Sequence, residues 1–138
     1  MIIAIRISGL VEIPKGVNET LFRMRLRRKY SAVLLKESEE NLKLLRRVRN
    51  FIAYGDIDDE TLSLLITKRA KSLDNKKIDS GAILEHLKNK GMLNLKIKPF
   101  FRLHPPRGGI DSKLHFPLKK GVLGDNKSKI NDLVRRML

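Results

Sequence analysis

"IIAIRI", residues 2–7, is the stretch of sequence that decides the fold. Ile3, Ile5 and Ile7 lie on one face of an extended chain, whereas smaller or polar residues take the other face. The dipeptide "SG" follows at once and is typical of a turn or loop. The pattern predicts a half-buried first strand whose isoleucine face covers the hydrophobic core.

Working outward from this strand, hydrophobic periodicity and capping residues predict the other elements. Strands are expected at residues 31–36 and 95–103, the second interrupted by Pro99, and helices from Asn18 to about Arg28, from Ser38 to Tyr54 with Gly55 as its stop, over 60–70 after Asp58 or Asp59, over 81–90 after Asp79 or Ser80, and within 125–138. This order predicts an α+β fold, ferredoxin-like, in which helices pack on one face of a small antiparallel sheet of three strands.

The length of 138 residues suits one domain with an appended arm and is too short for two ordinary domains. We expect residues 1–103 to form the ferredoxin-like core, with a two-helix insertion at about residues 56–91. Residues 104–138 are expected to form a basic arm and a terminal helix. The arm should be irregular, because prolines and glycines interrupt any apolar period there.

Charge indicates the kind of partner. Lysine and arginine exceed aspartate and glutamate by 15, and the pI is near 10.4, which favours binding to a polyanion. Residues 92–138 hold 11 basic and 3 acidic side chains, and "RMRLRRKY", residues 23–30, holds a second basic cluster without an acid. The sequence contains no cysteine and no apolar run of the ~20 residues that a membrane span needs. We expect a cytoplasmic protein with no membrane contact.

Two alternatives to a structural RNA-binding protein stay open. His104, Asp111 and His115 could form a metal or nuclease cluster, and a small phosphodiesterase could be built on the two histidines, but their spacing matches no metal motif. A general nucleoid protein that coats DNA would need the same positive charge. The scarcity of aromatic residues favours phosphate and shape contacts over base stacking. No catalytic group, cofactor or metal is expected.

Three segments together resemble a known family: "RLHPPRGGIDSKLHFPLKKGVLGDN" (residues 102–126), "FIAYGDIDDETLSLLITKRA" (51–70) and "IIAIRISGLVEIPKGVNETLFRMRLRRKYSAVLL" (2–35). They are similar to the large-subunit ribosomal proteins called L-thirty in archaea, which are related to eukaryotic L-seven. The resemblance covers nearly the whole chain, and "LHPPRGG" is its most specific part. It implies a ferredoxin-like core and a structural role on the large ribosomal subunit.

The resemblance also implies the partners: 23S-type rRNA, the 5S rRNA region and neighbouring ribosomal proteins, with the protein present as a monomer within the ribosome. By position, it places RNA contacts in the arm from Arg102 to Gly124 and in the basic first helix from Arg23 to Lys29. Combined with the chemistry of the side chains, this gives a set of candidate RNA-binding residues. They are Arg23, Arg25, Arg27, Arg28, Lys29, Arg102, His104, Arg107, Gly108, Gly109, Lys113, His115, Lys119 and Lys120.

Overall fold

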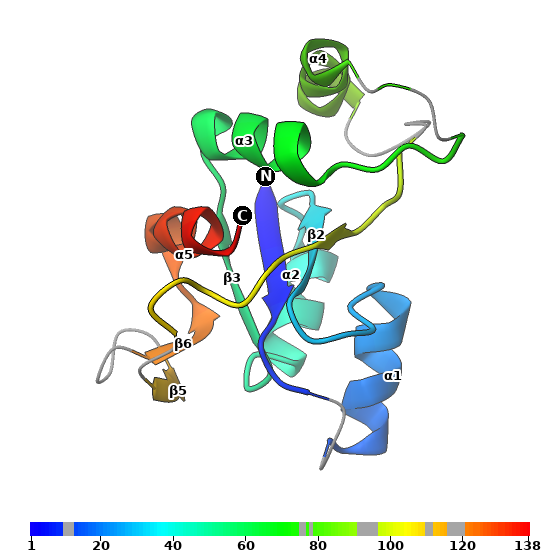
Figure 1. Ribbon diagram of the computed structural model, residues 1–138. Coiled ribbons are helices and arrows are strands. Elements are labelled where there is room, and N and C mark those ends of the chain that lie inside the picture. The colour runs from blue at the N-terminus through cyan, green and yellow to red at the C-terminus, as the bar shows by residue number, and fades with distance from the viewer. Residues whose placement is uncertain (10–12, 75–76, 78, 91–96, 110–111, 116–120) are drawn as a thin grey trace.

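The computed structural model describes residues 1–9, 13–74, 77, 79–90, 97–109, 112–115 and 121–138 (Figure 1). In chain order its elements are β1 (Ile2–Arg6), α1 (Lys15–Arg23), β2 (Ser31–Leu35), α2 (Glu39–Arg47), β3 (Ile52–Asp56), α3 (Asp59–Arg69), α4 (Ser80–Lys90), β4 (Phe101–Arg102), β5 (Ser112–His115), β6 (Gly121–Asp125), a 3₁₀ turn (Lys127–Lys129) and α5 (Ile130–Met137).

The described strands form a single sheet in the order β4-β2-β1-β3-β6-β5. The first four strands in this order pair with one another in antiparallel fashion, and Ala4 of β1 lies opposite Val33 of β2 and Tyr54 of β3. β6 runs parallel to both β3 and β5, so the sheet is mixed rather than purely antiparallel. The α+β class with a ferredoxin-like core is confirmed, on a sheet wider than the expected three strands.

Helices cover both faces of this sheet, and the prediction of one covered face was wrong (Figure 1). Ile3, Ile5 and Ile7 pack with residues of α3, α4 and α5. Ile2 and Ala4 on the opposite face pack with α1 and α2. β1 is therefore buried on both sides, not half-buried. The small or charged residues at alternate positions suggested that the second face of β1 is exposed to solvent. A small residue, however, also permits a helix to pack closely on that face.

Arg6 shows how a charged side chain is accommodated in this central strand. It is fully buried, and its guanidinium donates hydrogen bonds to the carbonyl oxygens of Leu26 at 2.7 Å, Ser8 at 3.0 Å and Gly9 at 3.1 Å. Burial lowers the pKa of Arg6, because removal from water disfavours the charged form. The three carbonyls replace the water that the guanidinium loses, and they tie β1 to the loops on either side of α1.

The second helix ends earlier than predicted. α2 is capped by the Ser38 hydroxyl, which accepts from the Asn41 amide at 3.3 Å, and it stops at Arg47 rather than continuing to Tyr54. Residues 52–56, where the predicted helix was expected to end, form β3 instead. The hydrophobic spacing of these residues favoured a helix. They form a strand because β-branched and aromatic side chains fill the pleated surface beside β1, and the β1 backbone supplies hydrogen bonds.

Gly55 accordingly lies inside β3 and is not a helix stop. A Cβ atom built on it would meet the Lys127 carbonyl oxygen, and it would lie 2.9 Å from Cβ and Cγ2 of Ile130. The start of α5 therefore packs directly on the backbone of β3. Glycine is needed at this position for close approach, and a left-handed conformation plays no part.

Part of the segment expected to be irregular forms strands. β6 pairs with β3 through Ala53 opposite Gly124 and Tyr54 opposite Asp125, and β5 pairs with β6. Short strands held mainly by backbone pairing need no alternation of apolar residues, which is why the sequence pattern missed them. Of the predicted last strand, only β4 forms a named strand among the described residues; it follows Pro99 and pairs with β2. The terminal helix is confirmed as α5, with Ile130, Leu133, Val134 and Met137 buried.

Candidate nucleic-acid interface

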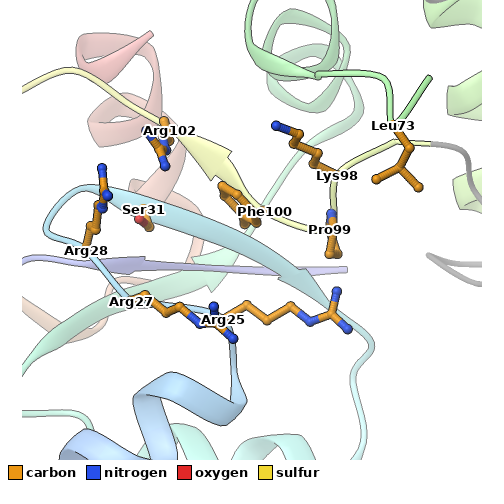
Figure 2. Close-up of a pocket in the computed structure, with 9 residues that line it drawn as sticks. All are labelled: Arg25, Arg27, Arg28, Ser31, Leu73, Lys98, Pro99, Phe100 and Arg102. Carbon is orange, nitrogen blue, oxygen red and sulfur yellow. The ribbon is translucent and has the colours of Figure 1, made fainter. Parts of the chain in front are cut away.

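The loop after α1 and two later segments, one between α3 and α4 and the other leading into β4, enclose a hollow of 530 Å³ (Figure 2). We call it the basic hollow. Its lining residues are Arg25, Arg27, Arg28, Ser31, Leu73, Lys98, Pro99, Phe100 and Arg102. All of the charged residues among these described side chains are cations. The arrangement concentrates positive charge in a concave site, which is how proteins attract anionic ligands.

The first side of the basic hollow depends on how α1 ends. The helix begins at Lys15, directly after Pro14, and stops at Arg23, so the predicted span from an Asn18 cap to Arg28 was wrong. Arg25 follows in the left-handed conformation with φ of 66°. The backbone then turns, so Arg27 does not continue the helix that carries Arg23.

Two backbone hydrogen bonds define this turn. The Leu26 amide donates to the Leu21 carbonyl at 2.9 Å, and the Arg25 amide donates to the Phe22 carbonyl at 3.0 Å. These are the two bonds of a Schellman motif, in which glycine is the usual left-handed residue. Met24 and Leu26 are buried on either side of Arg25, which is itself exposed. The turn therefore anchors its apolar neighbours and directs the Arg25 side chain outward into the basic hollow (Figure 2).

The backbone of Arg25 is thus strained at a position where glycine would not be. We expect Arg25→Gly to increase the free energy of unfolding by about 1 kcal/mol, because the left-handed conformation destabilises a residue that carries a Cβ by roughly that amount. Urea unfolding followed by circular dichroism would measure the gain. Arg27→Gly is the matched control, because it removes the same charge at a neighbouring exposed position whose φ is not positive. Equal stability changes in the two variants would contradict the account of strain.

The opposite side of the basic hollow comes from the chain leading into β4. Lys98 and Arg102 lie here, and the Arg102 guanidinium carbon is 5.9 Å from the centre of the Phe100 ring. A smaller hollow of 110 Å³ adjoins it, shares these three residues and adds Arg69 and Lys71 from the end of α3. Two parts of the chain that are far apart in sequence thus extend one positive surface.

Within the described part of the chain, the ion pairs found at surface side chains do not involve these cations. They join Lys88 to Asp59 at 3.3 Å, and Arg135 to Asp58 at 3.7 Å and Glu60 at 3.4 Å. The arginines and lysines of the two hollows therefore repel one another, with no ion-pair partner among the described side chains. Such a surface is stabilised by bound anions.

The "LHPPRGG" segment lies elsewhere, against the end of α5 (Figure 1). The His104 amide donates to the Met137 carbonyl at 2.9 Å, and the Arg107 amide donates to the Arg136 carbonyl at 3.0 Å. In return, the Arg136 Nε donates to the Arg107 carbonyl at 2.9 Å, and its Nη2 donates to the Gly109 carbonyl. The loop is fastened to the C-terminal helix on both sides of Arg107.

The two glycines of this loop have an intramolecular role. The Gly109 amide donates to the Pro106 carbonyl at 3.0 Å, which closes a four-residue turn, and Gly108 has a φ of 78° at its third position. A positive φ at this position is the requirement of a type II turn, and glycine meets it without strain. The turn presents the exposed Arg107 to solvent.

The structure brings together only part of the predicted set. Arg25, Arg27, Arg28 and Arg102 line the basic hollow. The others with described side chains lie outside it: Arg23 at the end of α1, Lys29 with its Nζ 5.1 Å from the centre of the Tyr30 ring, and His104, Arg107, Gly108 and Gly109 beside α5. Lys113 and His115 belong to β5 by their backbone, but their side chains, with Lys119, Lys120 and Asp111, lie outside the described residues. Among the described side chains, no group of three potential ligands could hold a metal ion.

Sequence reasoning missed Arg69, Lys71, Lys98 and Phe100. The runs "KRAK" (68–71) and "KPFF" (98–101) gave the available signal, since both place basic residues beside an apolar position. Either run alone is indistinguishable from a solvated surface segment. Only the tertiary fold shows that they meet.

Comparisons with known proteins identify the family. No family model matches the chain. Three curated relatives are each named large ribosomal subunit protein uL30: from Aeropyrum pernix, 34% identical over 97% of this chain and 96% of the relative; from Pyrobaculum aerophilum, 33% identical over 97% and 92%; and from Saccharolobus islandicus, 34% identical over 97% and 96%. The chain belongs to the uL30 family.

Membership of the uL30 family confirms the resemblance to archaeal large-subunit proteins that was carried by "LHPPRGG" and the two other segments. The uL30 relatives match across both the basic hollow and the loop fastened to α5, because the similarity covers nearly the whole chain. Within the residues that the structure describes, no helix combines the length and the apolar character needed to cross a membrane.

Proposed function

We propose that this uL30-family protein is a structural constituent of the large ribosomal subunit that binds and stabilises folded rRNA through phosphate and shape contacts. Its family supports the place on the subunit. The observation that carries the RNA contact is the convergence of cations from three separate parts of the sequence on two adjoining hollows, with no acid among the described lining residues. No catalytic step forms part of the proposal, and the protein would reside in the cytoplasm with ribosomes.

The binding surface would have two parts. The basic hollow would neutralise phosphates with Arg25, Arg27, Arg28 and Arg102, because arginine can donate two parallel hydrogen bonds to one phosphate. The loop beside α5 would present Arg107 to a second stretch of RNA, held in place by its hydrogen bonds to Arg136. The remaining residues of the set would extend these contacts: Arg23, Lys29, His104, Gly108, Gly109, Lys113, His115, Lys119 and Lys120. The partner would be 23S-type rRNA near the 5S rRNA region, with neighbouring ribosomal proteins.

The salt dependence of binding tests this proposal. Replacing Arg27 and Arg28 together by Gln should reduce the magnitude of the slope of log affinity against log salt concentration by about 1.5. Each phosphate contact that is lost means that binding releases fewer counterions from the RNA. Fluorescence anisotropy with purified large-subunit rRNA across a salt series would measure it. The matched control replaces Arg46 and Arg47 on the exposed side of α2 by Gln, with the same change in net charge and no expected change in slope.

Equal slopes for the two double variants would show that net charge alone drives binding and would contradict the proposed surface. Comparison with duplex DNA addresses the nucleoid alternative. If the protein binds duplex DNA as tightly as rRNA at every salt concentration, the shape component of the proposal is wrong.

A further inference from the structure

Apolar side chains in the wall of the basic hollow are not accounted for by phosphate contacts. Leu73 is 58% exposed, the largest exposed fraction found for a large hydrophobic residue within the described chain. It lies in the wall with Pro99 and Phe100, beside the cations. A site for phosphate alone gains nothing from an exposed leucine, because the free energy of an apolar surface falls only when another apolar surface covers it.

We propose that the basic hollow receives one unpaired nucleotide of the bound RNA, with its base against Phe100, Pro99 and Leu73 and its phosphates held by the surrounding cations. This inference rests on the proposed function and makes it more specific. A nucleotide joins a flat, largely apolar base to an anionic phosphate, so its two ends match the two kinds of side chain found here.

The positions of the side chains fit such a ligand. In Figure 2, Arg25 and Arg27 lie on one side of Phe100 and Pro99, and Lys98 lies on the other side. The apolar surface is therefore flanked by positive charge in both directions along which the RNA backbone could run. The volume of 530 Å³ falls within the roughly 300–1,000 Å³ typical of small-ligand sites.

Phe100 offers an aromatic surface at this site. Its ring is partly buried against the core, and the Arg102 guanidinium carbon lies 5.9 Å from its centre. Aromatic rings and arginine planes are the surfaces on which proteins stack unpaired bases. A base within a duplex is stacked on its neighbours and has no free face, so the hollow selects for an unpaired nucleotide.

Phe22 provides a matched comparison within the same molecule. It is 42% exposed, and the Arg27 guanidinium carbon lies 5.9 Å from its ring centre, as Arg102 does from Phe100. Phe22 nevertheless lies outside the basic hollow, in an open depression formed with Asn18, Glu19 and Arg23. An acid lies nearby and no wall encloses the ring, so we expect this aromatic–arginine pair to bind no base. Phe22 is therefore the natural control for Phe100.

The test uses the full chain and three short RNA hairpins: one with a single unpaired adenosine, one with an abasic residue at that position, and one fully paired. The abasic hairpin keeps every phosphate and removes only the base. We expect it to bind about tenfold more weakly than the hairpin with the adenosine, and the paired hairpin to be similarly weak. Phe100→Leu, which keeps apolar bulk but removes the ring, should abolish most of this difference, whereas Phe22→Leu should preserve it.

Leu73→Ser is a second variant that tests the site without the risk of a folding defect, because Leu73 is exposed and its replacement leaves the core intact. It should reduce the preference for the unpaired adenosine in part. Equal affinity for the unpaired and abasic hairpins would overturn the inference, as would preferential binding of free adenosine monophosphate or of an acidic peptide. If all three hairpins bind equally with steep salt dependence, the nucleotide site fails while the proposed function stands; if neither they nor rRNA bind, both fail.

Discussion

Adding a single methyl group at Gly55 should destabilise the protein by about 3 kcal/mol, at the upper end of the range for overpacking. The new Cβ of Gly55→Ala would collide with the Lys127 carbonyl oxygen and lie 2.9 Å from two side-chain carbons of Ile130. A backbone carbonyl cannot rotate away as a flexible side chain can, so the start of α5 would have to leave the sheet. Urea unfolding monitored by circular dichroism at a helix wavelength would measure the change.

Gly16→Ala is the control for this experiment, because a Cβ there meets nothing within 4 Å and the residue lies inside α1. Alanine should stabilise that helix by roughly 0.5–1 kcal/mol. The two substitutions are chemically identical, so opposite signs would isolate the effect of close packing. If Gly55→Ala unfolds at the same urea concentration as the parent, the direct contact between β3 and the start of α5 is wrong.

Removing the buried guanidinium should have a comparable effect. We expect Arg6→Met to cost about 3 kcal/mol, because the carbonyls of Leu26, Ser8 and Gly9 each lose a donor worth about 1 kcal/mol or more. Methionine retains most of the apolar packing, so the loss reports mainly on the hydrogen bonds. Thermal and urea unfolding would measure it.

Arg49→Met serves as the control, since Arg49 is exposed and the same replacement there should change stability by less than about 0.5 kcal/mol. Arg6 also fixes the carbonyl of the residue that follows Arg25, so its loss should loosen the turn that faces the basic hollow. A variant Arg6→Met with parental stability would mean that water replaces the guanidinium at these carbonyls without cost.

An element could be predicted from the sequence when the interaction that determines it joins residues close together in the chain. The helix starts at Asp58 and Asp79 were predictable, because each capping side chain accepts from an amide two or three residues away: from Thr61 at 2.6 Å, and from Gly81 at 3.1 Å. β3 was mistaken for helix because its partner β1 lies far away in sequence. β6 was missed for the same reason.

The candidate site follows the same rule. The runs that contain Arg25, Arg27, Arg28 and Arg102 stood out as local clusters of charge or as part of a family segment, and the structure brings these four together. Lys98 and Phe100 gain their significance only from tertiary neighbours. The left-handed conformation of Arg25 also had no signal, because arginine gives no indication of a turn that glycine normally marks.

The parallel pairing of β3 with β6 also bears on how the molecule is made. The paired residues Tyr54 and Asp125 are separated by about half of the chain, so β3 is synthesised well before its second neighbour exists. At the roughly 5–20 residues per second of translation, the nascent chain presents an unpaired strand edge and an uncovered isoleucine face for several seconds. Residues 1–60 hold 12 basic and 9 acidic side chains, so little net charge repels nascent copies when β3 emerges, and this interval is when edge-to-edge aggregation is least opposed.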